Sequence, residues 1–394
     1  MIALVVLLLI LALIGHWSLC VGFFNRVAAS MLPCALVGPL EKLAMLAAAV
    51  VPVGFGVWCR LANITSLDDM LARHDGQAWL LYQTLCVIAA GRLLVGWWRT
   101  RREPIAQLVT NDTQHYNVAA ELGQAPVGSL SGRLGAWIPY NEICHLAAPV
   151  KTLRMATLPP ELDGLSIVHL SDLHFTGQLT LDYYRYVIDR ANEMHGDIVV
   201  VTGDIIDKEA YLDWLPETFG RLQAKHGVYF ILGNHDKRLR DVPDLRKRLT
   251  QCGMIDVGGR AVMREINGVE VQIAGNELPW FPLRAAAEVF VPEARESSVF
   301  RVLLSHTPDQ YAWARERNYH LMLAGHCHGG QVRVPGIGAI VSPSRFGAKY
   351  ASGLFYEAPT LLHVSSGLGG THPLRWNCPP ELATLVLHHA AVES

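Results

Sequence analysis

Residues 165–174 read LSIVHLSDLH, a short apolar run that ends abruptly in Ser171, Asp172 and His174. A continuous apolar run of this length is typical of a strand buried on both faces of a sheet. Four further runs have the same form: DIVVV before Thr202, GVYFIL before Gly233, VFRVLL before Ser305 and HLMLA before Gly325. Amphipathic stretches separate these runs, and the alternation predicts an α/β fold.

A polar cluster follows each of the five runs. The clusters are Asp172-Leu173-His174, Gly203-Asp204-Ile205-Ile206-Asp207, Gly233-Asn234-His235-Asp236, Ser305-His306-Thr307-Pro308 and Gly325-His326-Cys327-His328-Gly329-Gly330-Gln331. Ligands of open α/β folds gather at the carboxyl ends of strands, so we expect the clusters to converge. Taken singly they are weak evidence, because Asp172 could be a helix N-cap and His306 a turn histidine. Turns and helix caps do not explain five such clusters in this order, each after an apolar run.

The residue types in these clusters predict a metal centre. Carboxylate and imidazole ligands together suit Mn, Fe or Zn better than Ca or Mg. A carboxylate can bridge two ions, and two ions about 3.5–4 Å apart can clamp both oxygens of a phosphoryl displacement. Water bound to such an ion has its pKa lowered from about 15.7 towards about 7. We therefore expect two divalent metal ions and hydrolysis of a phosphoester by metal-activated hydroxide.

The five clusters resemble the signature of calcineurin-like metallophosphoesterases: D-x-H, G-D-x-x-D, G-N-H-[DE], a histidine before a small residue and proline, and G-H-x-H. LPPELDGLSIVHLSDLHF, AGHCHGGQ, VSSGLGG and LRWNCPPEL resemble the bacterial membrane-associated branch, which includes UDP-2,3-diacylglucosamine pyrophosphatases and other phosphodiesterases. The resemblance covers about residues 152–388. It implies a four-layer sandwich with two mixed sheets between helices.

The resemblance also implies a set of metal ligands. The first metal would be held by Asp172, His174, Asp204 and His328, and Asp204 would bridge to a second metal held by Asn234, His306 and His326. Every ligand position of the family pattern is filled in this sequence.

His235 would be the histidine that is not a ligand, donating to a phosphoryl oxygen or protonating the leaving group, since imidazole titrates near neutral pH. We predict that Asp236 orients His235 and that Asp207 supports the site from outside the ligand set. Arg238, next to Lys237 and Arg240, is a candidate for binding a substrate phosphate, although a solvated basic helix start explains it equally well. Cys327 is expected to be a packing residue, with metal binding or redox control as the lesser alternative.

The first hundred residues have a different character. Residues 1–24 contain no Asp, Glu, Lys or Arg. The basic start and small-residue cleavage site of a signal peptide are not evident, so we expect a retained transmembrane helix. Further apolar runs cover about residues 43–58 and 78–98, and we predict about three spans in a transmembrane region 1–102.

Arg99, Arg101 and Arg102 follow the third apolar run. Basic residues beside a membrane helix favour the cytoplasmic side, so we expect a multi-pass cell-membrane protein with a cytoplasmic catalytic domain. With two or four spans, only the side of the membrane on which the N-terminus lies would change. We predict a linker over residues 103–151, with a strand or short helix docking on the next domain, and the metallophosphoesterase domain over residues 152–390.

Composition limits the functions that we consider. Hydrophobic residues make up 51% of the chain and charged residues 17%, and the formal net charge is −2. This charge gives no basic field for nucleic acid, so a nuclease is not expected. The eight cysteines contain no C-x-x-C pair, which favours free thiols in a reducing compartment.

We expect hydrolysis of a phosphodiester or pyrophosphate bond, with a lipid-linked substrate such as UDP-2,3-diacylglucosamine as the sharpest version. One alternative is a membrane-tethered phosphodiesterase or phosphatase that acts on soluble or wall-associated substrates. Another is a membrane sensor with a catalytically silent metal site. The presence of His235 beside a full ligand set argues against the sensor, because a structural metal site does not need this histidine.

Overall fold

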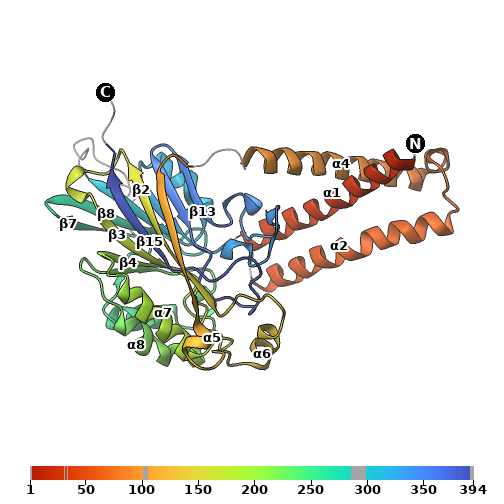
Figure 1. Cartoon of the computed structure of the whole chain (residues 1–394). Coiled ribbons are helices and arrows are strands. Elements are labelled where there is room, and N and C mark those ends of the chain that lie inside the picture. Colours follow the sequence, from red (N-terminus) through yellow and green to blue (C-terminus); the bar gives the residue numbers. More distant parts are fainter. Residues whose placement is uncertain (1, 31, 33, 101–104, 285–298, 391–394) are drawn as a thin grey trace. The chain divides into compact units, whose positions relative to one another are not determined.

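The computed structural model describes residues 2–30, 32, 34–100, 105–284 and 299–390, and the chain divides into two units, Met1–Pro104 and Ile105–Ser394 (Figure 1). The first unit is helical. Its helices are α1 (Ile2–Ala28), α2 (Cys34–Leu61), α3 (Leu67–Leu71) and α4 (His74–Thr100).

Three helices of the first unit are long and apolar enough to cross a membrane, and they cover the apolar runs from which three spans were predicted. Most of their leucine and valine side chains are exposed, as suits a lipid environment. Gly15 of α1 lies directly against α4, where a Cβ atom would fall 1.7 Å from the carbonyl oxygen of Cys86. A small residue is therefore required at this helix crossing.

The second unit contains two large mixed sheets. The seven-stranded sheet has the order β1 (Leu108–Asn117), β2 (His145–Met155), β15 (Ala383–His389), β3 (Leu165–Leu170), β4 (Ile198–Thr202), β5 (Val228–Ile231), β6 (Ile255–Asp256). The six-stranded sheet has the order β13 (Gly353–Glu357), β14 (Thr360–Val364), β10 (Leu321–Ala324), β9 (Phe300–Ser305), β8 (Val269–Asn276), β7 (Ala261–Ile266). Strands β11 (Arg333–Val334) and β12 (Gly338–Ala339) form a small separate sheet.

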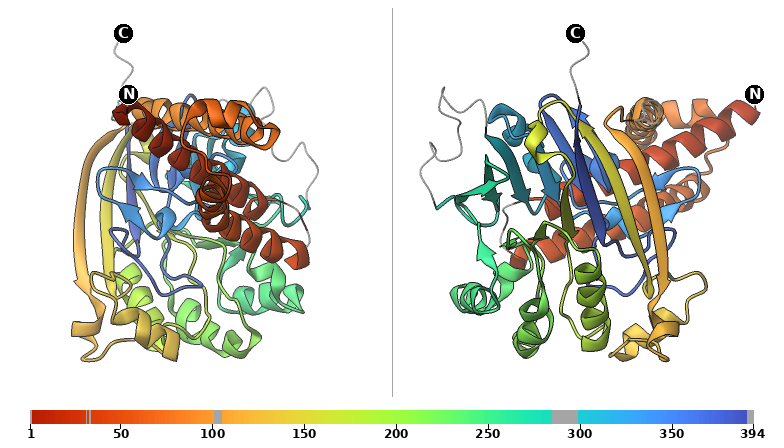
Figure 2. Two further views of the ribbon diagram at one scale, coloured as in Figure 1. Left: turned by 90° about the vertical axis from the view of Figure 1, so that its right-hand side faces the viewer. Right: turned by 60° about the vertical axis from the view of Figure 1, so that its left-hand side comes forward.

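Short helices complete this unit: α5 (Val118–Glu121), α6 (Leu130–Ala136), α7 (Leu181–Glu193), α8 (Leu215–Thr218), α9 (Val242–Gln251) and α10 (Tyr311–Glu316). Helices α7, α8 and α9 pack on the outer face of the seven-stranded sheet, and their green ribbons lie together on one side of the unit (Figure 2). Helix α10 packs on the outer face of the six-stranded sheet.

Alternation along the buried strands builds the layers. In β3, Val168 packs against the helices while Ile167 enters the apolar core between the two sheets. In β10, Leu323 enters the same central core, whereas Met322 packs towards α10. Both faces of each strand are buried, so most positions are apolar rather than only alternate ones, with Ser166 and His169 of β3 and Arg301 of β9 among the polar exceptions. The predicted four-layer α/β sandwich is confirmed.

The segment predicted to be a linker, residues 103–151, contains a strand that docks on the sheet of the second unit. Strands β1 and β2 form an antiparallel pair from Leu108↔Leu153 to Asn117↔His145, and β2 pairs with β15. Residues 105–151 therefore belong to the second unit, which is larger than the predicted 152–390. The sequence predicted a docking strand or short helix in this segment but not its bounds, because β1 is an exposed edge strand, LVTNDTQHYN, and has no apolar run.

The site is positioned by parallel strands. Strands β3, β4 and β5 run parallel in one sheet, and β9 and β10 run parallel in the other. Each of the five polar clusters follows the carboxyl end of one of these strands. Residues more than a hundred positions apart in the sequence are thereby brought together.

Candidate active site

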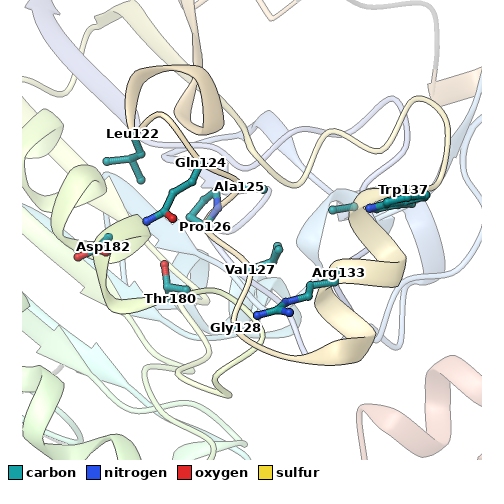
Figure 3. A pocket seen from close by; sticks show the side chains of 11 residues that line it. Leu122, Gln124, Ala125, Pro126, Val127, Gly128, Arg133, Trp137, Thr180 and Asp182 are labelled. Carbon is teal, nitrogen blue, oxygen red and sulfur yellow. The ribbon is translucent and has the colours of Figure 1, made fainter.

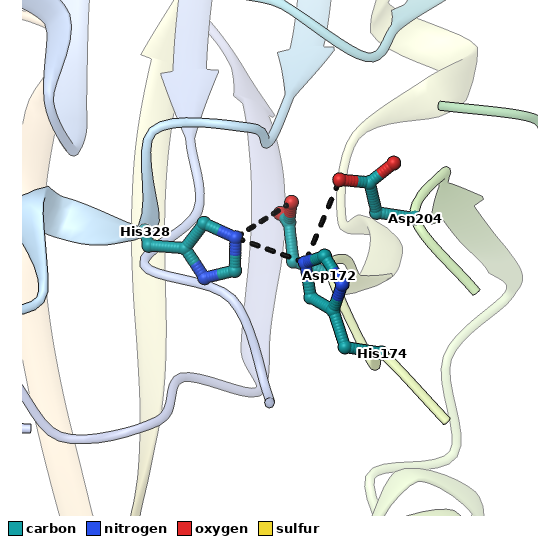
Figure 4. A group of neighbouring side chains, drawn as sticks. All are labelled: Asp172, His174, Asp204 and His328. Carbon is teal, nitrogen blue, oxygen red and sulfur yellow. Dashed lines mark hydrogen bonds and ion pairs between the residues drawn. The ribbon is translucent and has the colours of Figure 1, made fainter. Parts of the chain in front are cut away.

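Four side chains from three different strand ends form the first group. Asp172, His174, Asp204 and His328 each present one ligand atom, and these atoms lie within 4.8 Å of one another (Figure 4). Nε2 of His328 is 3.4 Å from Oδ1 of Asp172 and 3.1 Å from Nε2 of His174. Nε2 of His174 is 3.5 Å from Oδ2 of Asp204.

Asp204 also belongs to a second group, which it forms with His306 and His326. Oδ2 of Asp204 lies 3.3 Å from Nε2 of His306. Oδ1 of Asn234 lies 3.1 Å from the same nitrogen. The seven residues predicted to be metal ligands are thus brought together in two groups that share one carboxylate.

The surroundings of His306 fit a bound cation. Its Nδ1 lies 2.7 Å from the carbonyl oxygen of Thr202 and must donate a proton to it. In a neutral ring, the Nε2 lone pair then faces the oxygens of Asn234 and Asp204 with no proton between them. A cation satisfies all three acceptors at once. Nε2 of His326 is likewise buried without a hydrogen-bond partner among the described residues, as expected of a side chain that waits for a ligand.

Electrostatics in the site also favour positive charge. Burial raises the pKa of Asp204, but His306 and His235 more than offset this, so its pKa lies well below the usual range. Burial lowers the pKa of His306, whereas the carboxylate of Asp204 raises it more strongly, to about 9. Burial and the neighbouring His306 lower the pKa of His326 to about 3. The Asp204 carboxylate is thus ionised and the His326 imidazole is neutral, as metal ligands must be. A metal ion bound to His306 would displace the proton that the raised pKa keeps on that ring.

The backbone at the site is unusual. Five of the candidate ligands have left-handed φ values although none is glycine: Asp172 (53°), His174 (52°), Asp204 (51°), His326 (68°) and His328 (50°). Such conformations cost on the order of 1–3 kcal/mol each and cluster at functional sites. Gly325 shows how tight the site is, because a Cβ atom there would lie 1.8 Å from Oγ of Ser171 and 2.3 Å from Oδ2 of Asp172.

Asp207 takes the position that we predicted for Asp236. Its Oδ1 contacts Nδ1 of His235, and its Oδ2 lies 2.8 Å from Nδ1 of His174. Asp236 instead accepts hydrogen bonds from the backbone N–H groups of Gly233, Ile205 and Ile206, at 2.8, 3.0 and 3.0 Å. The predicted orientation of His235 by Asp236 is therefore wrong. Asp207 follows β4 and Asp236 follows β5, and only the tertiary structure shows which of the two reaches the imidazole.

Two residues near the site were not indicated by the sequence. Arg375 is fully buried beneath His328, and its guanidinium lies 3.1 Å from the carbonyl oxygen and 3.2 Å from Nδ1 of that residue. The ring of Trp280 lies 4.9 Å from that of His326 and 5.4 Å from that of His306. Arg375 is the only arginine of the motif LRWNCPPEL, and this was the one feature of the sequence that could have indicated it as a site residue. No feature of the sequence indicated Trp280.

The remaining predicted residues, Arg238 and Cys327, lie outside the two ligand groups. Arg238 is exposed on the turn Asp236–Arg238 that follows His235. Cys327 is fully buried in the core between the six-stranded sheet and α10, where it packs with Ala324 and Leu303.

A pocket of about 640 Å³ lies elsewhere, lined by residues 122 and 124–128 together with Arg133, Ala136, Trp137, Thr180 and Asp182 (Figure 3). It is lined by none of the candidate ligands. Pocket size alone therefore does not locate the chemistry of this protein.

Buried carboxylates and imidazoles at the carboxyl ends of strands from two mixed sheets define a metal-dependent phosphoester hydrolase. Residues 165–330 match the family model of the calcineurin-like phosphoesterases, and the chain belongs to this family.

Three relatives illustrate the family. The metallophosphoesterase YkuE of Bacillus subtilis is 30% identical over 67% of this chain and 94% of its own length. The phosphodiesterase YaeI of Escherichia coli is 26% identical over 59% of this chain and 86% of its own. A transmembrane protein with metallophosphoesterase domain from Bos taurus is 26% identical over 59% of this chain and 55% of its own.

Proposed function

We propose that this protein hydrolyses a phosphodiester or pyrophosphate bond of a lipid-linked substrate at a membrane surface, with two divalent ions drawn from Mn, Fe and Zn. The observation that carries the two-ion centre is that Asp204 belongs to both ligand groups. When bound, two such ions polarise the phosphoryl group and lower the pKa of water.

Each ligand group has its own role. In the proposed assignment, Asp172, His174 and His328 complete the first ion site, and Asn234, His306 and His326 complete the second. Asp204 is shared between the two sites. The strand ends that carry these side chains are held by the sheets, so the ligand geometry is set before any ion binds.

His235 is proposed to act on the substrate. The carboxylate of Asp207 holds its Nδ1–H, which leaves Nε2 free to face the leaving oxygen or a phosphoryl oxygen. The His235 side chain is 13% exposed, so it can reach a bound substrate. Arg238, exposed on the next turn, is proposed to bind a substrate phosphate. Asp236 is assigned to holding the backbone of the site instead of to catalysis.

A membrane-borne substrate is supported by exposed apolar side chains of the second unit. On and after α6, Leu130, Leu134, Trp137 and Tyr140 are 74, 64, 88 and 83% exposed. Tryptophan and tyrosine favour the boundary between lipid and water. Together with the three apolar helices, this surface favours action at the bilayer, and the arginines that follow α4 favour its cytoplasmic face.

A second candidate is a membrane-tethered phosphodiesterase for soluble substrates. The relative YaeI, which is named a phosphodiesterase, favours this version.

The test compares two substrates with the detergent-purified full-length protein and Mn²⁺. UDP-2,3-diacylglucosamine represents the lipid-linked class and bis-p-nitrophenyl phosphate the soluble diesters, with Asp204→Asn as the control. Preferential, Asp204-dependent cleavage of the lipid nucleotide is the expected result. Cleavage of the soluble diester alone would replace the lipid-linked proposal with the second candidate. If neither is cleaved, the metal content separates a different phosphoester specificity from a silent site.

A further inference from the structure

Behind the ligand groups lies a series of buried polar side chains with no role in the proposed chemistry. We call this series the buried relay; its members are Lys151, His363, His169, Thr202 and Ser171, and it ends on Asp172. The successive contacts are Nζ–Nε2 2.8 Å, Nδ1–Nδ1 2.9 Å, Nε2–Oγ1 2.8 Å, Oγ1–Oγ 2.8 Å and Oγ–Oδ2 2.6 Å. All six residues are buried.

The direction of these hydrogen bonds is fixed at the Asp172 end. As a metal ligand Asp172 would be ionised and could only accept, so the single hydroxyl proton of Ser171 points to its Oδ2 atom. Ser171 must then accept from Thr202, whose own single proton is thereby used. Thr202 in turn accepts from Nε2–H of His169.

The opposite end fixes the same direction independently. An ammonium group only donates, so Lys151 donates to Nε2 of His363. That ring carries its proton on Nδ1 and donates to Nδ1 of His169. Both rings must be neutral for this pattern. Burial lowers the pKa of His363 to about 4 and that of His169 well below its usual range.

The relay crosses the central core of the fold. His363 belongs to β14 of the six-stranded sheet, whereas Lys151, His169 and Thr202 belong to β2, β3 and β4 of the seven-stranded sheet. Glu381 balances the lysine charge at 2.5 Å and also accepts from the backbone of Ser366. Apolar side chains of similar shape are often as stabilising as a buried ion pair, so stability alone is a weak reason for this arrangement.

We infer that the buried relay positions Asp172 by presenting a hydroxyl proton to its Oδ2 atom, so that Oδ1 is left to a metal ion. Oδ1 lies 3.4 Å from Nε2 of His328, on the side of the first ligand group. The backbone N–H of His326 lies 3.0 Å from both carboxylate oxygens, so Oδ1 keeps a lone pair for a metal ion. Oδ2 is occupied by Ser171 at 2.6 Å. The members of the relay act through Asp172 and are positioning residues. The inference rests on the proposed role of Asp172 as a ligand.

Thr202→Val is the central test, because valine keeps the β-branched shape required by β4 and removes only the hydroxyl group. Thr202→Ser restores the hydroxyl and is the matched control. Mn²⁺ binding to metal-free, full-length protein in detergent is measured by calorimetry, so the readout does not depend on turnover. We expect Thr202→Val to weaken binding about 10–100-fold and Thr202→Ser to bind like wild type.

A double-mutant cycle tests transmission along the relay. Lys151→Met combined with Glu381→Gln removes both charges at the far end without leaving either one unpaired. This pair of changes should weaken Mn²⁺ binding in the wild-type background but add nothing to Thr202→Val. Thermal melting of each metal-free variant identifies unfolded protein, and Ser171→Ala replaces Thr202→Val if that variant does not fold.

Three results would overturn the inference. Thr202→Val could bind Mn²⁺ like wild type, Thr202→Ser could be as weak as Thr202→Val, or the far-end changes could add their full effect to Thr202→Val. Failure of the wild-type protein to bind Mn²⁺ would instead reject the proposed metal centre, and the relay with it. If the wild-type protein binds Mn²⁺ but does not hydrolyse the lipid-linked substrate, the proposed substrate is contradicted and the inference about the relay stands.

Discussion

Oδ2 of Asp207 lies 2.8 Å from Nδ1 of His174, and the other oxygen of the same carboxylate contacts Nδ1 of His235. One side chain therefore holds both a proposed metal ligand and the proposed proton donor. Each imidazole carries its proton on Nδ1, so each Nε2 is directed away from Asp207.

Asp207→Asn should lower kcat on either phosphodiester about 10–100-fold, because the amide cannot accept from both rings and at least one imidazole loses its orientation. Steady-state rates with saturating Mn²⁺ measure this effect. Asp213→Asn is the control, since the Asp213 side chain is 96% exposed. Equal activity of Asp207→Asn and wild type would show that neither ring depends on this carboxylate.

Gly325→Ala tests how closely the first ligand group is packed. The added methyl group would overlap Oγ of Ser171 and Oδ2 of Asp172, so one of them must move. We expect Mn²⁺ binding and hydrolysis to fall at least about tenfold. Gly220→Ala is the matched control, because the nearest atom to its new Cβ is Sγ of Cys252 at 4.0 Å. A normal Mn²⁺ affinity in Gly325→Ala would refute the tight geometry described for this site.

The buried imidazole of His363 should make the folded protein less stable in mild acid. Burial and the charge of Lys151 lower its pKa from 6.5 to about 4. Between these two values the unfolded chain binds a proton that the folded protein does not, so stability falls as the pH drops from 6.5 to about 4. For this one group the loss is on the order of 3 kcal/mol.

His363→Gln should therefore flatten the dependence of the melting temperature on pH over this window. Thermal melts in detergent between pH 7 and 4 measure the slope. His388→Gln, which replaces a histidine with a 40% exposed side chain, should keep the wild-type slope. Parallel curves for His363→Gln and wild type would contradict the assignment of a neutral, buried imidazole.

Trp137→Ser tests the exposed apolar surface beside α6. Loss of the indole should raise KM for a lipid-linked substrate in vesicles several-fold, because the side chain would otherwise enter the lipid boundary. Cleavage of bis-p-nitrophenyl phosphate should be unchanged. Trp137→Phe keeps the apolar character and should lose less activity on vesicles. An equal loss on both substrates would point to a folding defect instead of membrane contact.

The sequence by itself determined the parts of this protein that local pattern encodes. The apolar runs that became β3, β4, β5, β9 and β10 are buried on both faces, so most positions carry an apolar side chain and the signal is strong. The polar cluster after each run gave the candidate ligands. The length and hydropathy of the first hundred residues predicted the three helices that are long and apolar enough to cross a membrane, because a bilayer selects both properties.

Only the tertiary structure decided which of these residues meet. Asp207 rather than Asp236 reaches His235, because β4 and β5 lie in parallel with a fixed register. Lys151 meets His363 across 212 positions of sequence, and a lysine in β2 carries no local sign of such a partner. The exposed edge strand β1 gave no apolar pattern. These contacts depend on how neighbouring strands pair and on how the two sheets stack. The spacing of residues along one strand contains no information about either.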